Sequence, residues 1–251
     1  MTNWSDIDKE LSLWEQPATL WWRDDDASFF CHELELLLTL SARHAVPLHL
    51  AVIPEKLDST VAELLRNEDK TRIRVLQHGF EHANHAREGQ KKIELGGTQP
   101  LPALIKQLKQ GRNALMQQFG QQYLDILVPP WNRLEARVEA ALPDIGYQQL
   151  SVLGPRNSDA LLPQTNVHID IFDWKKRQLK EESDILTALL THLQQRRFQQ
   201  VDNQEPTGLM THHQVHDKDC WLFLEQFFTR LSSHTATCWV TGQALTQRSK
   251  H

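Results

Sequence analysis

Three consecutive aspartates and a pair of histidines have the clearest potential for chemistry in this sequence. Asp24, Asp25 and Asp26 directly follow an apolar run that ends at Arg23. His78 and His82 are four residues apart, so both rings would lie on one face if their segment is helical. Two histidines and one carboxylate, with positions left open for water and substrate, form a common catalytic metal shell. A divalent metal site is therefore expected.

The aspartate cluster is larger than a structural role requires. One aspartate could cap the helix expected after it, by accepting backbone N–H bonds at the helix start. Three adjacent carboxylates repel each other unless a cation offsets them, and Arg23 supplies only one positive charge. The cluster is better interpreted as one metal ligand plus one catalytic base.

Strand-length apolar runs alternate with segments of helical period along the chain. Such alternation is typical of α/β folds, and seven or eight units favour a (β/α) barrel over an open doubly wound sheet. No repeat or linker divides the sequence, so we predict a single domain over residues 1–251. Strands are expected at 18–23, 47–54, 72–77, 124–130, 147–154, 166–172, 207–212 and 236–242, and helices at 32–44, 59–67, 101–120, 183–198 and 219–233.

Five of the expected strands end in polar and aromatic residues. In parallel α/β folds, ligands bind beyond the carboxyl ends of the strands, so these clusters should converge on one face. A polar segment at 86–100 follows the second cluster and is expected to be either a lid or an exposed connection. The clusters are DDDA (24–27), HGFEHANH (78–85), PPWNR (129–133), DIFDW (170–174) and HHQVHD (212–217).

The order of these clusters resembles that of the polysaccharide deacetylase (NodB-homology) family. That family carries T-F-D-D-G, H-[ST]-x-x-H, R-x-P-[FY], D-x-x-D-W and L-x-H on a distorted (β/α) barrel. This chain has DDDA, HGFEH, PPWN, DIFDW and MTH in the same order. The resemblance implies a divergent member with a distorted (β/α)7-8 barrel and N-deacetylase activity.

The resemblance also implies roles for the first two clusters. Asp25 corresponds to the catalytic base, although the register could instead make Asp24 the base and Asp25 the ligand. In the first register the metal ligands are Asp26, His78 and His82.

The later clusters correspond to the general acid and to the walls of the substrate site. His212 resembles the general acid, and Asp173 resembles the residue that tunes the catalytic groups. The residues expected to line the substrate site are Pro130, Trp131, Asn132, Trp174 and His213.

One family residue is missing from the chain. The arginine that steadies the catalytic base should stand near Val128. Arg23 or Arg133 could replace it, because a guanidinium can approach a carboxylate bidentately from another direction. We therefore include Arg23 among the expected catalytic residues.

Composition limits the partners and the compartment. A net charge of −5 and a pI of about 6.2 give no general attraction to nucleic acid or to anionic membranes. The three cysteines have no metal-type or redox-type spacing, and the N-terminal residues lack the pattern of a signal peptide. We expect a cytoplasmic protein, and the sequence does not indicate its oligomeric state.

The expected activity is removal of an N-acetyl group from an amino sugar or a related small amide. The cofactor would be a divalent metal, with Zn²⁺ favoured and Co²⁺, Ni²⁺ or Mn²⁺ as alternatives. The partner would be a small-molecule or oligosaccharide substrate. Two alternatives remain: a metal-free hydrolase of cyclic amides, and a catalytically inactive carbohydrate-binding homologue.

Overall fold

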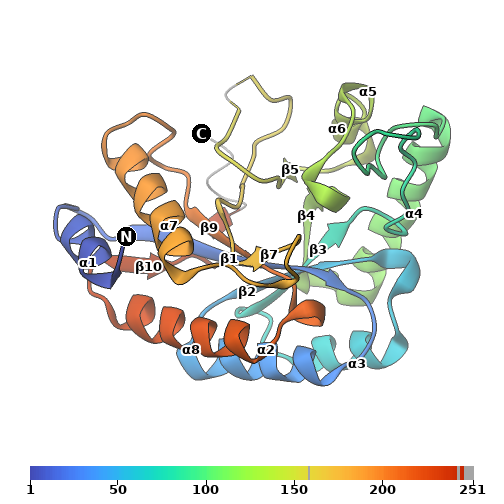
Figure 1. The fold of residues 1–251 in the computed structure, drawn as a ribbon. Helices are drawn as coiled ribbons and strands as arrows, with labels where there is room; N and C mark the ends of the chain where they lie inside the picture. Colours follow the sequence, from blue (N-terminus) through green and yellow to red (C-terminus); the bar gives the residue numbers. More distant parts are fainter. Residues whose placement is uncertain (158, 242–243, 246–251) are drawn as a thin grey trace.

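A curled sheet of parallel strands forms the centre of the structure, a computed structural model that describes residues 1–157, 159–241 and 244–245 (Figure 1). Hydrogen bonding orders the strands β5-β4-β3-β2-β1-β9-β6, and β10 pairs with the beginning of β1. The strands are β1 (Ala18–Ala27), β2 (Leu48–Val52), β3 (Ile73–His78), β4 (Tyr123–Val128), β5 (Gln149–Leu150), β6 (Ile169–Asp170), β9 (Thr207–Thr211) and β10 (Thr237–Trp239).

The curl of the sheet returns toward its own starting edge. Isolated parallel bridges join Leu150 to Gln164 and Leu153 to Val167. These bridges link the free edge of β5 to the segment that leads into β6, which itself pairs with β9. The predicted distorted (β/α)7-8 barrel is therefore confirmed.

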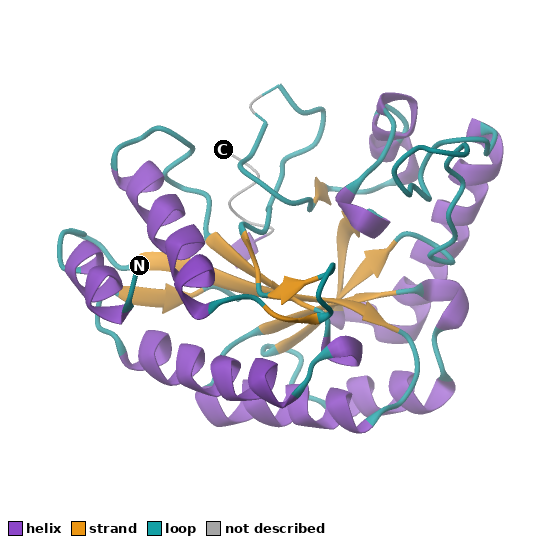
Figure 2. Ribbon diagram, in the orientation of Figure 1, coloured by secondary structure: helices purple, strands orange, loops and turns teal. Residues whose placement is uncertain are grey.

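Helices cover the outside of the curled sheet (Figure 2). Every helix that the periodicity predicted is present, with ends within one residue of those expected. In the part of the chain that the structure describes, none is long and apolar enough to cross a bilayer. The helices are α1 (Trp4–Leu11), α2 (His32–His44), α3 (Ser59–Asn67), α4 (Leu101–Phe119), α5 (Ala136–Glu139), α6 (Leu142–Ile145), α7 (Glu182–Arg197) and α8 (Lys218–Ser233).

The structure differs from the predicted elements in several places. Strand β1 extends to Ala27, beyond the expected end at residue 23, and β5 covers only two residues of the strand expected at 147–154. Helix α1 was not expected in its polar segment, but Asn3 and Asp6 form a capping box at its start. The strand expected at 166–172 contributes only β6 to the barrel, and β7 (Phe172–Asp173) forms an antiparallel hairpin with β8 (Gln178–Leu179). Strand β10 ends at Trp239, and residue 242 of the expected strand lies outside the described residues.

Strand β1 runs through the middle of the barrel wall and alternates between its two faces. Trp22 packs against Phe228 of α8, with ring centroids 4.5 Å apart, on the helical side. Trp21 lies in the interior cluster with Met210 of β9. The two tryptophans thus lie on opposite faces of the strand, and Arg23 and Asp25 share the interior face with Trp21.

Candidate metal and catalytic site

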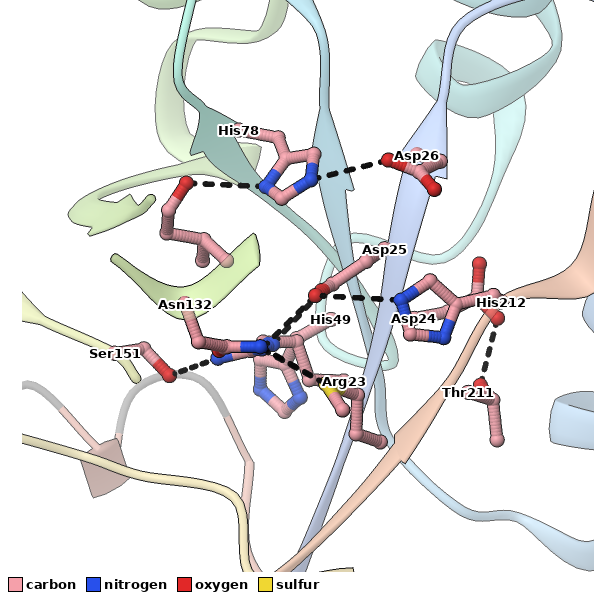
Figure 3. A network of polar contacts seen from close by, with 12 residues as sticks. Arg23, Asp24, Asp25, Asp26, His49, His78, Asn132, Ser151, Thr211 and His212 are labelled. Atoms are coloured by element: carbon pink, nitrogen blue, oxygen red, sulfur yellow. Dashed lines mark hydrogen bonds and ion pairs between the residues drawn. The ribbon is translucent and has the colours of Figure 1, made fainter. Parts of the chain in front are cut away.

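The three aspartates at the end of β1 point in three directions (Figure 3). Asp25 faces the barrel interior, and Asp24 faces the opposite side because side chains alternate along a strand. The pairing of β1 with β2 shifts register between Asp24 and Ala27, and Asp26 has a φ of 73°. This bulge turns the Asp26 carboxylate toward β3.

Asp26 meets both histidines of the second cluster. Its Oδ1 atom lies 3.1 Å from His78 Nε2 and 3.3 Å from His82 Nε2. Ligand atoms about 2.0 to 2.1 Å from a tetrahedral Zn²⁺ are roughly 3.3 Å apart. The residues that the sequence suggested as metal ligands therefore lie together at ligand-like spacing.

The hydrogen bonding of this trio leaves atoms free to bind a cation. His78 Nδ1 donates to the Val128 carbonyl at 3.0 Å, so the lone pair of the neutral ring is on Nε2, facing Asp26. Among the described residues, Asp26 Oδ1 is buried without a regular hydrogen-bond donor. Burial lowers the pKa of His82, which favours its neutral, metal-binding form. One oxygen and two nitrogens suit Zn²⁺ or a similar ion.

The geometry that brings His82 to Asp26 is not helical, so that premise of the sequence analysis was wrong. Strand β3 ends at His78, and the next residues form a bend in which His82 has a φ of 55°. The carboxylate of Glu94 accepts hydrogen bonds from the backbone of this bend. Glu94 was not predicted, because an acidic residue in a polar segment carries no distinguishing signal.

Arg23 holds the predicted base, Asp25, from within the same strand. Its Nε lies 2.8 Å from Asp25 Oδ1 and its second guanidinium nitrogen lies 2.9 Å from Oδ2. The guanidinium also donates to Ser151 Oγ at 2.6 Å and to Asn132 Oδ1 at 2.8 Å. Arg133 instead donates to a surface carbonyl, so Arg23 is the arginine that reaches the base.

The predicted general acid lies across from Asp25. His212 Nε2 is 4.0 Å from Asp25 Oδ2, and the half-exposed ring of Trp174 packs edge-on against the imidazole at 4.7 Å. His212 Nδ1 is buried and has no hydrogen-bond partner within the described residues. The orientation of the His212 ring therefore depends on its packing against Trp174 and on the nearby carboxylate of Asp25.

Asp24 and His213 form a buried ion pair behind the site. Asp24 accepts hydrogen bonds from His213 Nδ1, from the His213 backbone N–H at 3.0 Å and from the Thr211 hydroxyl at 2.6 Å. Burial opposes both charges, but the pairing prevails: the pKa of Asp24 lies below its usual range and that of His213 rises to about 10. His213, expected in the substrate site, is instead fully buried, and it anchors the loop that carries His212.

The Asp173 carboxylate is engaged within its own hairpin. It accepts the backbone N–H groups of Lys175 and Lys176, at 2.9 and 3.0 Å, within the turn of the β7–β8 hairpin. The carboxylate that accepts the Trp174 indole N–H is Asp170, at 3.0 Å. The structure thus places Asp25, rather than Asp173, beside His212.

The PPWN cluster supports both halves of the site. The Trp131 ring packs on His82 with centroids 4.4 Å apart, and Asn132 binds the Arg23 guanidinium. Trp131 and Asn132 both have positive φ values, 56° and 54°, which is uncommon and concentrates at functional sites. Pro130 lies tightly against Gly79 in the metal-binding bend.

A second group of possible metal ligands, His168, His192 and Glu205, lies at the opposite, amino ends of the strands. The Gly208 backbone N–H donates to His168 Nδ1, which leaves the proton of the neutral ring on Nε2 and removes its lone pair. The Arg156 guanidinium lies 3.7 Å from Glu205 and disfavours a further cation. We therefore assign no metal to this group.

Comparison with known proteins gives a match in structure. No protein-family model and no curated protein matches the sequence. A Mycobacterium smegmatis protein classed as a polysaccharide deacetylase superposes with a TM-score of 0.61, at 13% identity over 94% of this chain and 92% of that one. The Bacillus subtilis peptidoglycan deacetylase PdaC superposes with a TM-score of 0.59, at 12% identity over 93% and 91%.

A family 4 carbohydrate esterase pseudoenzyme from Bacillus anthracis also matches, with a TM-score of 0.55 and 14% identity over 88% of this chain and 63% of that one. At such identities a structural match establishes the fold. The resemblance inferred from the motifs is thus confirmed at that level: this divergent chain has the fold of the polysaccharide deacetylases.

Proposed function

We propose that the protein is a metal-dependent hydrolase that removes an N-acetyl group from an amino sugar or a related small amide. The observation that carries this proposal is one cluster at the carboxyl ends of the strands. Asp26, His78 and His82 converge there beside Asp25, and His212 faces the same carboxylate. Amide hydrolysis requires an activated water, a stabilised oxyanion and a proton for the departing nitrogen.

Each side chain has a chemical role in this proposal. A divalent ion held by Asp26, His78 and His82, most simply Zn²⁺ but also Co²⁺, Ni²⁺ or Mn²⁺, supplies Lewis acidity toward the carbonyl and the water. Asp25 accepts the proton of the water, and Arg23 holds the Asp25 carboxylate in place. His212 donates a proton to the nitrogen that leaves.

Two tryptophans support an amino sugar or acyl group as the substrate. Trp131 packs on His82, on the metal side, and Trp174 packs on His212, on the acid side. Flat indole faces pack well against a sugar ring or an acyl methyl. The three cysteines are free thiols, which supports the proposed cytoplasmic location and hence a small or intracellular substrate.

An inactive carbohydrate-binding homologue is the second candidate. Arg23 engages both oxygens of Asp25, and a carboxylate held in this way is a weaker acceptor for a proton from water. One structural match, the Bacillus anthracis protein, is itself described as a pseudoenzyme. A metal-free hydrolase of cyclic amides is less favoured, because the three-ligand cluster is intact.

The deciding experiment is a screen of N-acetylated sugars and small amides with acetate as the readout. Acetate release by the parent protein, and its loss in Asp25→Asn with metal content unchanged, would support the proposed hydrolase. A fully active Asp25→Asn variant would exclude Asp25 as the base. Sugar binding without acetate release would support the inactive homologue.

A further inference from the structure

Glu94 is a buried carboxylate in the polar segment at 86–100. Glu94 is 1% exposed, although residues 87–92 of the same segment are exposed. Its carbonyl accepts a hydrogen bond from His85 Nδ1 at 2.8 Å, and the adjacent Leu95 bridges to Leu134. The backbone is therefore fixed on both sides, and the side chain points inward.

The Glu94 carboxylate accepts hydrogen bonds from the backbone N–H groups of three consecutive residues. Oε1 accepts from Phe80 at 2.8 Å and from Glu81 at 2.9 Å, and Oε2 accepts from His82 at 3.2 Å. These donors belong to the bend that follows His78 and carries His82. A bend outside a helix or sheet must satisfy its buried N–H groups in this way, since each one left unpaired destabilises the fold.

The bend depends on an uncommon backbone at both ends. Gly79 and His82 have φ values of 56° and 55°. A Cβ atom at Gly79 would come within 2.2 Å of Glu94 Oε2, so the carboxylate lies directly against the backbone. Because non-glycine residues rarely adopt a left-handed conformation, the His82 backbone needs surrounding contacts to hold it.

We propose that Glu94 is the positioning residue that builds the metal-binding bend, by holding the backbone of His82 where its imidazole meets Asp26. The inference rests on the proposed metal site and deepens it. The proposal also gives the 86–100 segment a role, because its residue Glu94 stabilises the backbone that carries a metal ligand. The two histidines, four residues apart, are brought together by a bend that this carboxylate stabilises and not by a helical turn.

Glu94→Gln tests the proposal, because the amide replaces one acceptor oxygen by a donor that one of the three N–H groups would then face. The control is Glu135→Gln: Glu135 accepts the Gly97 N–H at 2.7 Å and so ties down the same segment from its other end. The readouts are the Zn²⁺ dissociation constant, from competition with a chromophoric chelator, and the unfolding temperature of the metal-free protein.

We expect Glu94→Gln to weaken Zn²⁺ binding about 10- to 100-fold. Glu135→Gln should change the Zn²⁺ affinity less than about threefold. This difference between the two variants should hold even if both substitutions lower the unfolding temperature. If Glu94→Gln does not fold, Gly79→Ala disturbs the same contact and should weaken binding similarly. Equal affinity in the parent and the variant, or an equal loss in Glu135→Gln, would overturn the role of Glu94. A parent protein that binds no Zn²⁺ would instead overturn the metal site.

Discussion

Arg23 donates hydrogen bonds to both carboxylate oxygens of Asp25, which lies two positions later in the same strand (Figure 3). Residues i and i+2 of a strand share a face, so the two side chains enter the barrel interior together. Arg23 on β1 thus provides the positive charge beside the base that the family arginine, expected near Val128, would have provided. Asn132 and Ser151 each accept one further guanidinium N–H and so help to fix the Arg23 side chain.

Replacing Arg23 by lysine should impair turnover. Lysine keeps the charge but loses the planar, two-point contact with Asp25. We expect kcat/KM to fall roughly 10- to 100-fold, the range typical of groups that orient a catalytic residue. Steady-state acetate release measures this effect, with Arg133→Lys as the matched control. Equal losses in the two variants would contradict the role of Arg23.

The ion pair of Asp24 and His213 should contribute to stability rather than to metal binding. Removing one partner of a buried ion pair typically costs about 3 to 5 kcal/mol, because the other charge is left uncompensated. Asp24→Asn should therefore lower the free energy of unfolding in urea by about that amount and leave the metal content unchanged. In the double variant with His213→Asn, the loss should be smaller than the sum of the single losses.

Loss of metal in Asp24→Asn without loss of stability would contradict this assignment. It would indicate that Asp24 is itself a metal ligand. Loss of acetate release in Asp24→Asn with metal content and stability unchanged would instead favour the alternative register, in which Asp24 is the base and Asp25 the ligand. Strictly additive free energies would instead show that the two side chains are not coupled.

Asp173 should contribute little to turnover, because its carboxylate binds backbone N–H groups within the hairpin turn. We expect Asp173→Asn to keep kcat/KM within about threefold of the parent. A large loss of kcat in Asp173→Asn would restore the role that its motif implies.

Trp174→Ala removes the ring that packs on His212 and should raise KM, as expected for loss of binding contacts.

Folding stability should fall in mild acid partly because of His49. Burial lowers the pKa of this imidazole to about 4, and its Nδ1 donates to the Trp22 carbonyl at 2.9 Å. The unfolded chain takes up the proton near pH 6.5, so stability is lost as the pH falls from 6.5 toward 4, by about 2 kcal/mol at pH 5.

His49→Asn isolates this contribution, because asparagine keeps a donor near the Nδ1 position but does not titrate. Urea unfolding at pH 7.5 and pH 5 should show the parent losing about 2 kcal/mol more than the variant. Parallel losses in the two proteins would mean that His49 is not the group responsible.

The sequence predicted the barrel well because its apolar periods and turn residues are local signals. The places of the barrel strands along the chain and the five helices follow from such signals, and the convergence of the polar clusters follows from the parallel topology. Helix α1 was missed because only a capping box and two buried apolar residues, Ile7 and Leu11, distinguish it. Strands β7 and β8 were missed because two-residue strands leave no periodicity.

The candidate site was predicted in its residues but not in its geometry. Asp26 reaches the histidines through a bulge, and His82 reaches Asp26 through a left-handed bend. Neither feature has a glycine or another signature at the position concerned. Glu94 was invisible for a related reason, since its partners are backbone N–H groups, which every sequence contains.

Metal content tests the central claim most directly. The parent protein should hold about one divalent ion per chain after dialysis, measured by elemental analysis. Asp26→Ala should hold none, whereas His192→Ala, in the second histidine cluster, should still hold one. A parent without metal, or undiminished metal in Asp26→Ala, would contradict the proposal that Asp26, His78 and His82 bind the catalytic ion.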